Sequence, residues 1–154
     1  DQIANNAGKA GGIIGRVNGN ASGSSIENCY TSGDINAIGG GNAGGIVGKV
    51  DGGKLVIKNC IAWNSMLVST DKAKVGRIVG GTANATYENC YAYDGMILKA
   101  GEATFTVSDE TSPSGSSFQG VAKSANELKN TVINWDSSLW KEGGNGYPVF
   151  KWSK

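Results

Sequence analysis

The stretch Ala43-Gly44-Gly45-Ile46-Val47-Gly48-Lys49-Val50 decides the fold, because the chain repeats it. It stands earlier as Ala10-Gly11-Gly12-Ile13-Ile14-Gly15-Arg16-Val17 and later, degraded, as Val75-Gly76-Arg77-Ile78-Val79-Gly80-Gly81-Thr82. The central isoleucines Ile13, Ile46 and Ile78 lie 33 and 32 residues apart. Recurrence at one such period indicates a repeat protein, so each motif has to be interpreted as part of a repeat.

A second block, ending in Asn-Cys and one further residue, follows each copy: Ile26–Tyr30, Ile57–Ile61 and Tyr87–Tyr91. Beyond each cysteine, apolar residues recur two positions apart, which is the period of a strand with one buried face: Ile35 and Ala37, Met66 and Val68, Met96 and Leu98. Each repeat therefore predicts three short strands, and residues 1–100 show no helical period. A coil of about 30 residues built in this way is typical of a parallel β-solenoid, whose equivalent positions stack about 4.8 Å apart.

Stacking predicts ladders of identical side chains. Asn28, Asn59 and Asn89 are expected to form an amide ladder at a corner of the coil. Cys29, Cys60 and Cys90 are expected to form a row of buried free thiols, because a row is not a tetrahedral metal site and offers no fourth ligand. The outward positions Glu27, Lys58 and Glu88 alternate in sign, as a stack of favourable charge pairs requires.

The two ends of the chain differ from the repeats. Ile3 precedes Ile13 by about the spacing that separates Ile35 from Ile46, so the first residues look like the last strand of a preceding coil. We therefore expect residues 1–100 to be solenoid repeats that begin in mid-repeat, in the C-terminal part of a longer protein with upstream coils. The degraded third glycine block is typical of a terminal coil.

Residues 101–154 are expected to form a capping segment within the same structural domain. A short strand is predicted at Ala103–Val107. The pattern Ser124-Ala125-Asn126-Glu127 is a capping box and predicts a short helix through Leu128–Thr131. Three of the four tryptophans fall in the last twenty residues, and we expect these aromatic side chains to seal the open end of the coil stack.

Composition excludes several classes of function. The net charge is +1, which gives no electrostatic footprint for nucleic acid, and no apolar run approaches the length of a membrane span. The chain has no histidine, so zinc-peptidase helices and Ser-His-Asp or Cys-His arrangements are impossible. The carboxylates Asp34, Asp51, Asp71 and Asp94 are dispersed and form no pair for glycoside chemistry. We predict no enzyme activity, no metal and no cofactor.

The candidate ligand contacts are aromatic. Three residues after the second and third cysteines stand Trp63 and Tyr93, with Ser32 at the equivalent place in the first repeat. Facing outward, these rings would form a strip on which a sugar or a partner side chain could stack; facing inward, they are core. Ile61, in the column next to the cysteines, favours the inward orientation, and both alternatives stay open.

The recurrent A-G-G-I-(I/V)-G-x-V followed by I-x-N-C-Y resembles the GLUG-motif repeat of bacterial surface proteins. The tail V-A-K-S-A-N-E-L-K … W-D … L-W … G-Y-P-V-F-K-W resembles the segment that closes many such arrays. The resemblance implies an extracellular, right-handed parallel β-solenoid (β-helix) of about three coils. Such repeats occur in adhesins and as non-catalytic accessories to surface peptidases, and they carry no catalytic residues to transfer. The third glycine block and Ile61, where the family usually has Tyr, depart from the pattern.

The leading hypothesis is a non-catalytic module of a cell-surface or secreted bacterial protein, an adhesin-like or spacer solenoid that contacts extracellular proteins or glycans. The first alternative is a carbohydrate-binding module that uses exposed aromatic side chains. The second is a degenerate glycan-active β-helix enzyme.

Overall fold

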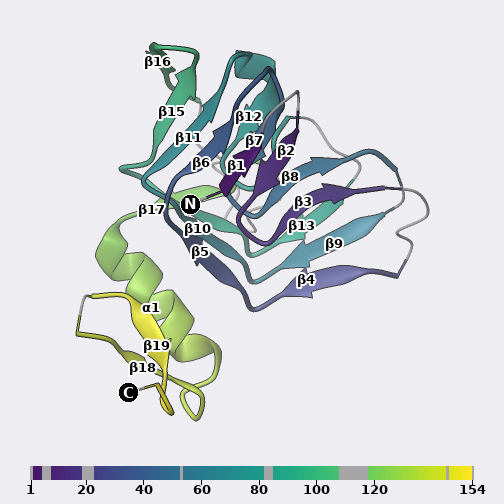
Figure 1. The fold of residues 1–154 in the computed structure, drawn as a ribbon. Coiled ribbons are helices and arrows are strands. Elements are labelled where there is room, and N and C mark those ends of the chain that lie inside the picture. The colour runs from purple at the N-terminus through teal and green to yellow at the C-terminus, as the bar shows by residue number, and fades with distance from the viewer. Residues whose placement is uncertain are drawn as a thin grey trace.

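The chain forms a parallel β-solenoid of about three coils, with one helix near its C-terminus (Figure 1). The computed structural model describes residues 2–4, 8–18, 23–52, 54–81, 85–107, 118–144 and 146–153, with only the backbone described for 2–4, 133 and 134. The fold class predicted from the repeats is thereby confirmed.

Each coil is made of short strands separated by corners. A single strand, β1 (Gln2–Ala4), precedes the first coil. The first coil contains β2 (Lys9–Gly11), β3 (Ile14–Val17), β4 (Ser25–Glu27), β5 (Tyr30–Ser32) and β6 (Ile35–Ala37). The second contains β7 (Asn42–Gly44), β8 (Val47–Val50), β9 (Leu55–Lys58), β10 (Ile61–Trp63), β11 (Met66–Ser69) and the 3-10 turn η1 (Lys72–Lys74). The third contains β12 (Val75–Gly76), β13 (Ala85–Glu88), β14 (Tyr91–Tyr93) and β15 (Ile97–Ala100).

The first two coils thus have five strand segments where three were expected. The chain bends within the glycine block, so this block contributes to two strands, β2 and β3 in the first coil. The residues after each Asn-Cys corner form a further strand, which the sequence interpretation left unassigned. Corners, rather than long strands, therefore set the shape of the coil.

Equivalent strands of successive coils pair in parallel. The strand β1 pairs with β6, with Gln2 opposite Ile35, so a strand is present where the first residues were expected to form one. Its register differs by one residue from the expected alignment of Ile3 with Ile35.

The predicted buried positions of the last strand in each coil were partly wrong. Ile35 stacks on Leu67, and Leu67 on Leu98, so Leu67 is buried whereas Met66 and Val68 are only half-buried. The turn before this strand is one residue longer in the second coil than in the first, and longer again in the third. Because side chains alternate along a strand, a slip of one residue exchanges the buried face for the exposed one.

The interior of the solenoid is filled by stacked apolar columns. Ile46 and Ile78 are fully buried in one column and Val47 and Val79 in the next. Complete burial of each such side chain contributes about 1.5–3 kcal/mol relative to leaving it in water. The outward charges also stack as expected, with Lys58 in register between Glu27 and Glu88, and its Nζ lies 3.0 Å from the Glu88 carboxylate.

The glycine block lets neighbouring coils approach backbone to backbone. A Cβ on Gly45 would lie 2.3 Å from the carbonyl oxygen of Arg77 and 2.6 Å from the Cβ of Ala62. Real Cβ atoms do not tolerate such distances, so any larger residue would push the coils apart. The amide of Gly45 in turn donates to the carbonyl of Arg77 at 3.1 Å.

Arg77, which replaces the glycine in the third coil, ties this coil to the segment that stacks on it next. Its Nε donates to the carbonyl of Gln119 and its guanidinium to that of Gly120, both at 3.0 Å. The backbone amide of Arg77 in turn donates a hydrogen bond to the side-chain Oε1 of Gln119. The strand β17 (Val121–Lys123) adds a fourth rung on β14, and β16 (Ala103–Phe105) folds back antiparallel on β15.

The aromatic C-terminal segment was expected to cover the end of the solenoid. It lies instead on the flank of the solenoid (Figure 1). It consists of α1 (Ala125–Trp135) and the antiparallel pair β18 (Trp140–Glu142) and β19 (Pro148–Phe150), which together we call the lid. The predicted capping box between Ser124 and Glu127 is confirmed, and the helix runs further than Thr131. The lid covers the sheet β17-β14-β10-β5 because the outward side chains of that sheet are large and apolar.

We expect Gly45→Ala to lower the free energy of unfolding by about 3 kcal/mol or more, because the added methyl group forces two coils apart. Urea denaturation followed by circular dichroism measures this change. Gly144→Ala is the matched control, since its Cβ would meet no atom within 4 Å, and it should stay within about 0.5 kcal/mol of the parent. Equal midpoints for the two variants would contradict the close-approach argument.

Candidate functional site

The three asparagines lie in one row at a corner between strands. Asn59 donates its side-chain amide to the Oδ1 of Asn28, and Asn89 donates to the Oδ1 of Asn59, each at 3.1 Å. All three have positive φ, between 50° and 54°, which asparagine tolerates better than most residues. The row therefore serves the turn and the stacking of the coils.

The three cysteines also lie one above another, beside the asparagine row. The thiols of Cys60 and Cys90 donate to the carbonyls of Ile26 and Ile57 in the preceding coil, at 3.4 and 3.3 Å. Burial raises the pKa of the Cys60 thiol to about 12 and that of Cys90 to about 11. Burial also raises the pKa of the half-buried Cys29 thiol. High pKa values keep the sulfurs protonated, so this row packs and donates hydrogen bonds rather than acting as a nucleophile.

A charged column on the coil surface is equally structural. Arg16 and Lys49 stack in register, and the carboxylate of Asp51 bonds to both cations. The hydrogen bond from Lys49 is the largest cause that lowers the pKa of Asp51, and Arg16 adds to it. Asp51 thereby neutralises two like charges that would otherwise repel each other across neighbouring coils.

Trp63 and Tyr93 point outward from the coil, contrary to the favoured inward orientation. The inward positions next to them are the small residues Ala62 and Ala92, both fully buried in the solenoid core. Trp63 is nevertheless only 5% exposed, because the lid covers it and the ring of Tyr147 lies 4.8 Å from its own. The half-buried Tyr93 borders, with Trp63 and Tyr147, a hollow of about 300 Å³.

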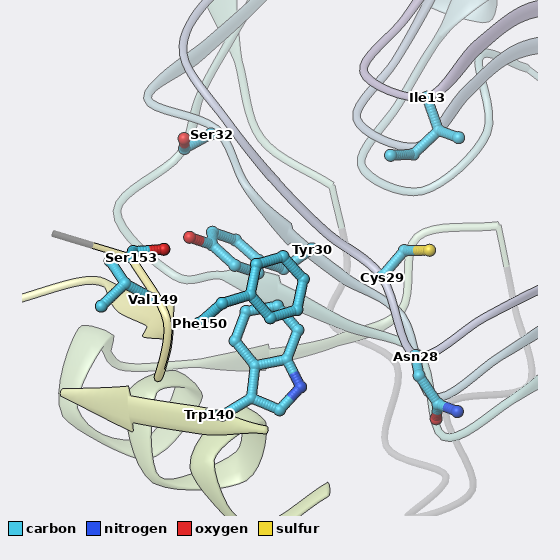
Figure 2. Close-up of a pocket in the computed structure, with 9 residues that line it drawn as sticks. All are labelled: Ile13, Asn28, Cys29, Tyr30, Ser32, Trp140, Val149, Phe150 and Ser153. Atoms are coloured by element: carbon cyan, nitrogen blue, oxygen red, sulfur yellow. The ribbon is translucent and has the colours of Figure 1, made fainter. Parts of the chain in front are cut away.

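The more open site is a groove between the first coil and the lid (Figure 2). It encloses about 460 Å³ and has a mainly apolar surface. The first coil contributes corner residues and part of β5, and the other wall comes from the lid hairpin and the residues after it. The lining residues are Ile13, Asn28, Cys29, Tyr30, Ser32, Trp140, Val149, Phe150 and Ser153. We call this site the coil-1 groove.

Aromatic side chains form the floor of the coil-1 groove. The rings of Tyr30 and Trp140 meet edge to face at 5.8 Å, and Phe150 stacks on Trp140 at 4.2 Å (Figure 2). Phe150 stacks in turn on Trp152, which is 67% exposed. Tyr30 donates its hydroxyl to the carbonyl of Pro148 at 2.6 Å, and burial is the main cause that raises its pKa. This bond ties the first coil to the lid.

Sequence reasoning missed this groove. It assigned the C-terminal aromatic residues to an end cap and did not connect them with Tyr30. A signal was present, because Tyr30, Ile61 and Tyr91 form a column of large side chains beside the small inward column of Thr31, Ala62 and Ala92. Small residues on one face and large ones on the other indicate that the large face needs a cover.

Within the described ranges, no group of three or more acidic or cysteine side chains is placed to share a metal ion. No helix in that part of the chain has the length and apolar character needed to cross a membrane. The lid helix α1 instead packs Leu128 and Val132 against Ile61 and Trp63.

A scan against models of known protein families and a search of curated proteins both gave no match. Among solved structures, the chain is similar to a crystal structure described as a putative immunoglobulin A1 protease from Bacteroides ovatus. The two share 49% sequence identity with a TM-score of 0.83. The match covers 95% of this chain and 43% of that chain, so the chain spans less than half the length of the protein it resembles.

Thiol alkylation tests the protonated cysteine row. At pH 8 we expect Cys60 and Cys90 to react with iodoacetamide at least about a hundredfold more slowly than an unperturbed thiol, because little thiolate is present and access is blocked. Cys29, which borders the coil-1 groove, should be modified first. Mass spectrometry of the labelled protein gives the three rates, and denaturation in guanidinium should make them equal. Labelling of Cys60 as fast as Cys29 in the native protein would refute the assignment.

Trp63→Ala should lower the free energy of unfolding by about 3 kcal/mol or more, because it removes a buried ring beneath the lid. Trp152→Ala, at the exposed end of the aromatic row, is the control and should change it by no more than about 0.5 kcal/mol. Chemical denaturation of both variants measures the difference. A Trp63→Ala protein as stable as the parent would show that the lid does not depend on this ring.

Proposed function

We propose that the chain is a non-catalytic module of a cell-surface or secreted bacterial protein, in which the solenoid acts as an adhesin-like or spacer element. In this proposal it belongs with the GLUG-motif repeats that its sequence resembles. Its surfaces make contacts with polypeptides, and any reaction of the whole protein is carried out elsewhere.

One observation carries this proposal: the five polar or charged residues that are buried in the described part of the chain all bond to the backbone, and only the buried hydroxyl of Tyr87 lacks a partner there. Each donates a hydrogen bond to a main-chain carbonyl, mostly of a neighbouring coil. They are Thr31, Asn42, Asn64, Ser69 and Arg77, which bond to Gly45, Gly80, Gly33, Gly41 and Gln119 in that order. These hydrogen bonds satisfy the backbone of the coil stack, which is a structural role.

The similarity to the Bacteroides ovatus structure supports the same assignment. That structure is described as a putative immunoglobulin A1 protease, and this chain corresponds to less than half of it. The chain contains no histidine, which most metal-dependent and triad peptidases require. We infer that the module accompanies peptidase chemistry located outside these residues and holds or spaces the catalytic part.

Two measurements test the proposal. The purified chain, incubated with immunoglobulin A1, should leave the heavy chain intact at enzyme-like and at stoichiometric concentrations, as judged by gel electrophoresis and mass spectrometry. An antibody raised against the module should label intact cells of the producing bacterium as strongly as permeabilised ones. Specific cleavage by the chain alone would overturn the non-catalytic role, and labelling that requires permeabilisation would overturn the location.

A further inference from the structure

The first coil has an open side. Among the described residues, β2, β3, β4 and β5 each lie at the edge of their sheet, and only β6 is covered, by β1. The amide of Ile61 donates to the carbonyl of Cys29, so this part of β5 faces the second coil. Because alternate residues of a parallel strand direct their backbone groups to opposite neighbours, Tyr30 and Ser32 direct theirs to the open side.

The side chains of the first coil show what that side lacks. Ile46 and Ile78 are completely buried, but their counterpart Ile13 is 44% exposed. Cys60 and Cys90 are likewise fully buried, whereas Cys29 is half-buried. In both the isoleucine column and the cysteine column, the more exposed member belongs to the first coil, which has no further coil on its N-terminal side among the described residues. Ile13 therefore occupies a position that is buried in the other two repeats, and it is exposed because no further coil covers it.

The lid reaches the edge strand of the first coil. The coil-1 groove is lined by residues of the first coil and of the lid hairpin, and no residue of the second coil borders it. Val149, Phe150 and Ser153 border this groove together with Tyr30 and Ser32 of the edge strand β5 (Figure 2). At the other rungs the lid covers outward side chains, Ile61 and Trp63 among them. The groove lies next to this interface between the lid and the sheet. It has room for one further strand, and none of the described residues occupies it.

We propose that the coil-1 groove is the acceptor site for one further solenoid strand, which adds in parallel to the open edge of β5 and is clamped by Phe150 of the lid. The occupant is the coil segment of the same polypeptide that leads into β1. This inference goes beyond the proposed function, because it holds for any role of the module.

The connection to β1 identifies the occupant. Gln2 lies opposite Ile35, and only two residues separate Ser32 from Ile35 in the first coil. A polypeptide entering β1 along the same path therefore lies over β5 immediately before it reaches β1. A strand from a second copy or from another protein would have to avoid this path.

The columns also specify the chemistry of the acceptor site. In β10 and β14 the residues are Ile61-Ala62-Trp63 and Tyr91-Ala92-Tyr93, and β17 is Val121-Ala122-Lys123. The first position faces the lid and is large and apolar, and the second faces the tight interior and is small. We expect the added strand to follow this pattern, with a large apolar residue against Phe150 and a small residue beneath Thr31.

The test extends the full chain by a copy of the segment that contains β4 and β5. A copy of residues 23–33 is fused directly before Asp1, which places the copied Gly33 ahead of Asp1 as Gly33 precedes Asp34 in the chain. The copy carries Glu27→Lys, so that it continues the alternation of charge. A matched extension also carries Tyr30→Asp and Thr31→Lys, which put charge against the lid and in the narrow interior.

Amide hydrogen exchange and acrylamide quenching of tryptophan fluorescence measure the result. The first extension should slow exchange at Tyr30 and Ser32 of the parent sequence by about tenfold or more, and reduce quenching. The matched extension should do neither. Phe150→Ala should abolish most of the protection in the extended chain, while the unextended chain with the same substitution serves as its stability control.

Three outcomes would overturn the proposal: equal exchange for both extensions, protection that is indifferent to Phe150→Ala, or a dimer of the 154-residue chain that buries the groove. Analytical ultracentrifugation of the unextended chain detects the third outcome, in which a second copy is the occupant. None of these results bears on whether the module cleaves immunoglobulin A1, so failure here is distinguishable from failure of the proposed function.

Discussion

The whole structure depends on how closely one coil can approach the next at the glycine block. At Gly11, Gly44 and Gly48 an added Cβ would lie within 2.5 Å of backbone atoms of another coil or of the same bend. Parallel strands must lie at hydrogen-bonding distance at every corner, and not only along their straight parts. The glycines make this possible at the sharpest bend. The apolar columns, the asparagine row and the thiol row then follow, because they stack only if the backbone does.

The two ends of the stack differ. At the C-terminal end Arg77 stands where the first two coils have glycine, and its guanidinium donates to the carbonyls of Gln119 and Gly120 in the rung that follows the third coil. At the opposite end Ile13 keeps the repeat residue of an interior coil and is exposed. In this chain the degraded repeat is therefore tied by side-chain hydrogen bonds to the last rung, whereas the faithful repeat around Ile13 lies at an edge that no further rung covers among the described residues. This contrast follows from the chemistry of Arg77 and not from its position alone.

The solenoid and its ladders were accessible from the sequence, because stacking constrains each position through its equivalents one period away. Three copies of Asn-Cys at a near-constant spacing are enough to align the coils. The burial of Leu67 in place of Met66 could not be predicted from the sequence. Residues 66–68 are all apolar, so their identity does not show that a turn longer by one residue has moved the buried position from Met66 to Leu67. The orientation of Trp63 failed for a related reason: a large side chain can be buried inside a coil or between the coil and a lid, and its identity does not separate the two.

By itself, then, the sequence determined the repeat, the parallel stacking, the closing helix and the absence of histidine chemistry. Each of these depends on local residue type or on a period along the chain. Only the tertiary structure decided that the aromatic tail lies along the flank, that Trp63 is covered, and that Tyr30 and Phe150 border one groove. Tyr30 and Pro148 are 118 residues apart, and no period relates them. Their contact follows from the shape of the outward face of one sheet, which exists only once the coils have stacked.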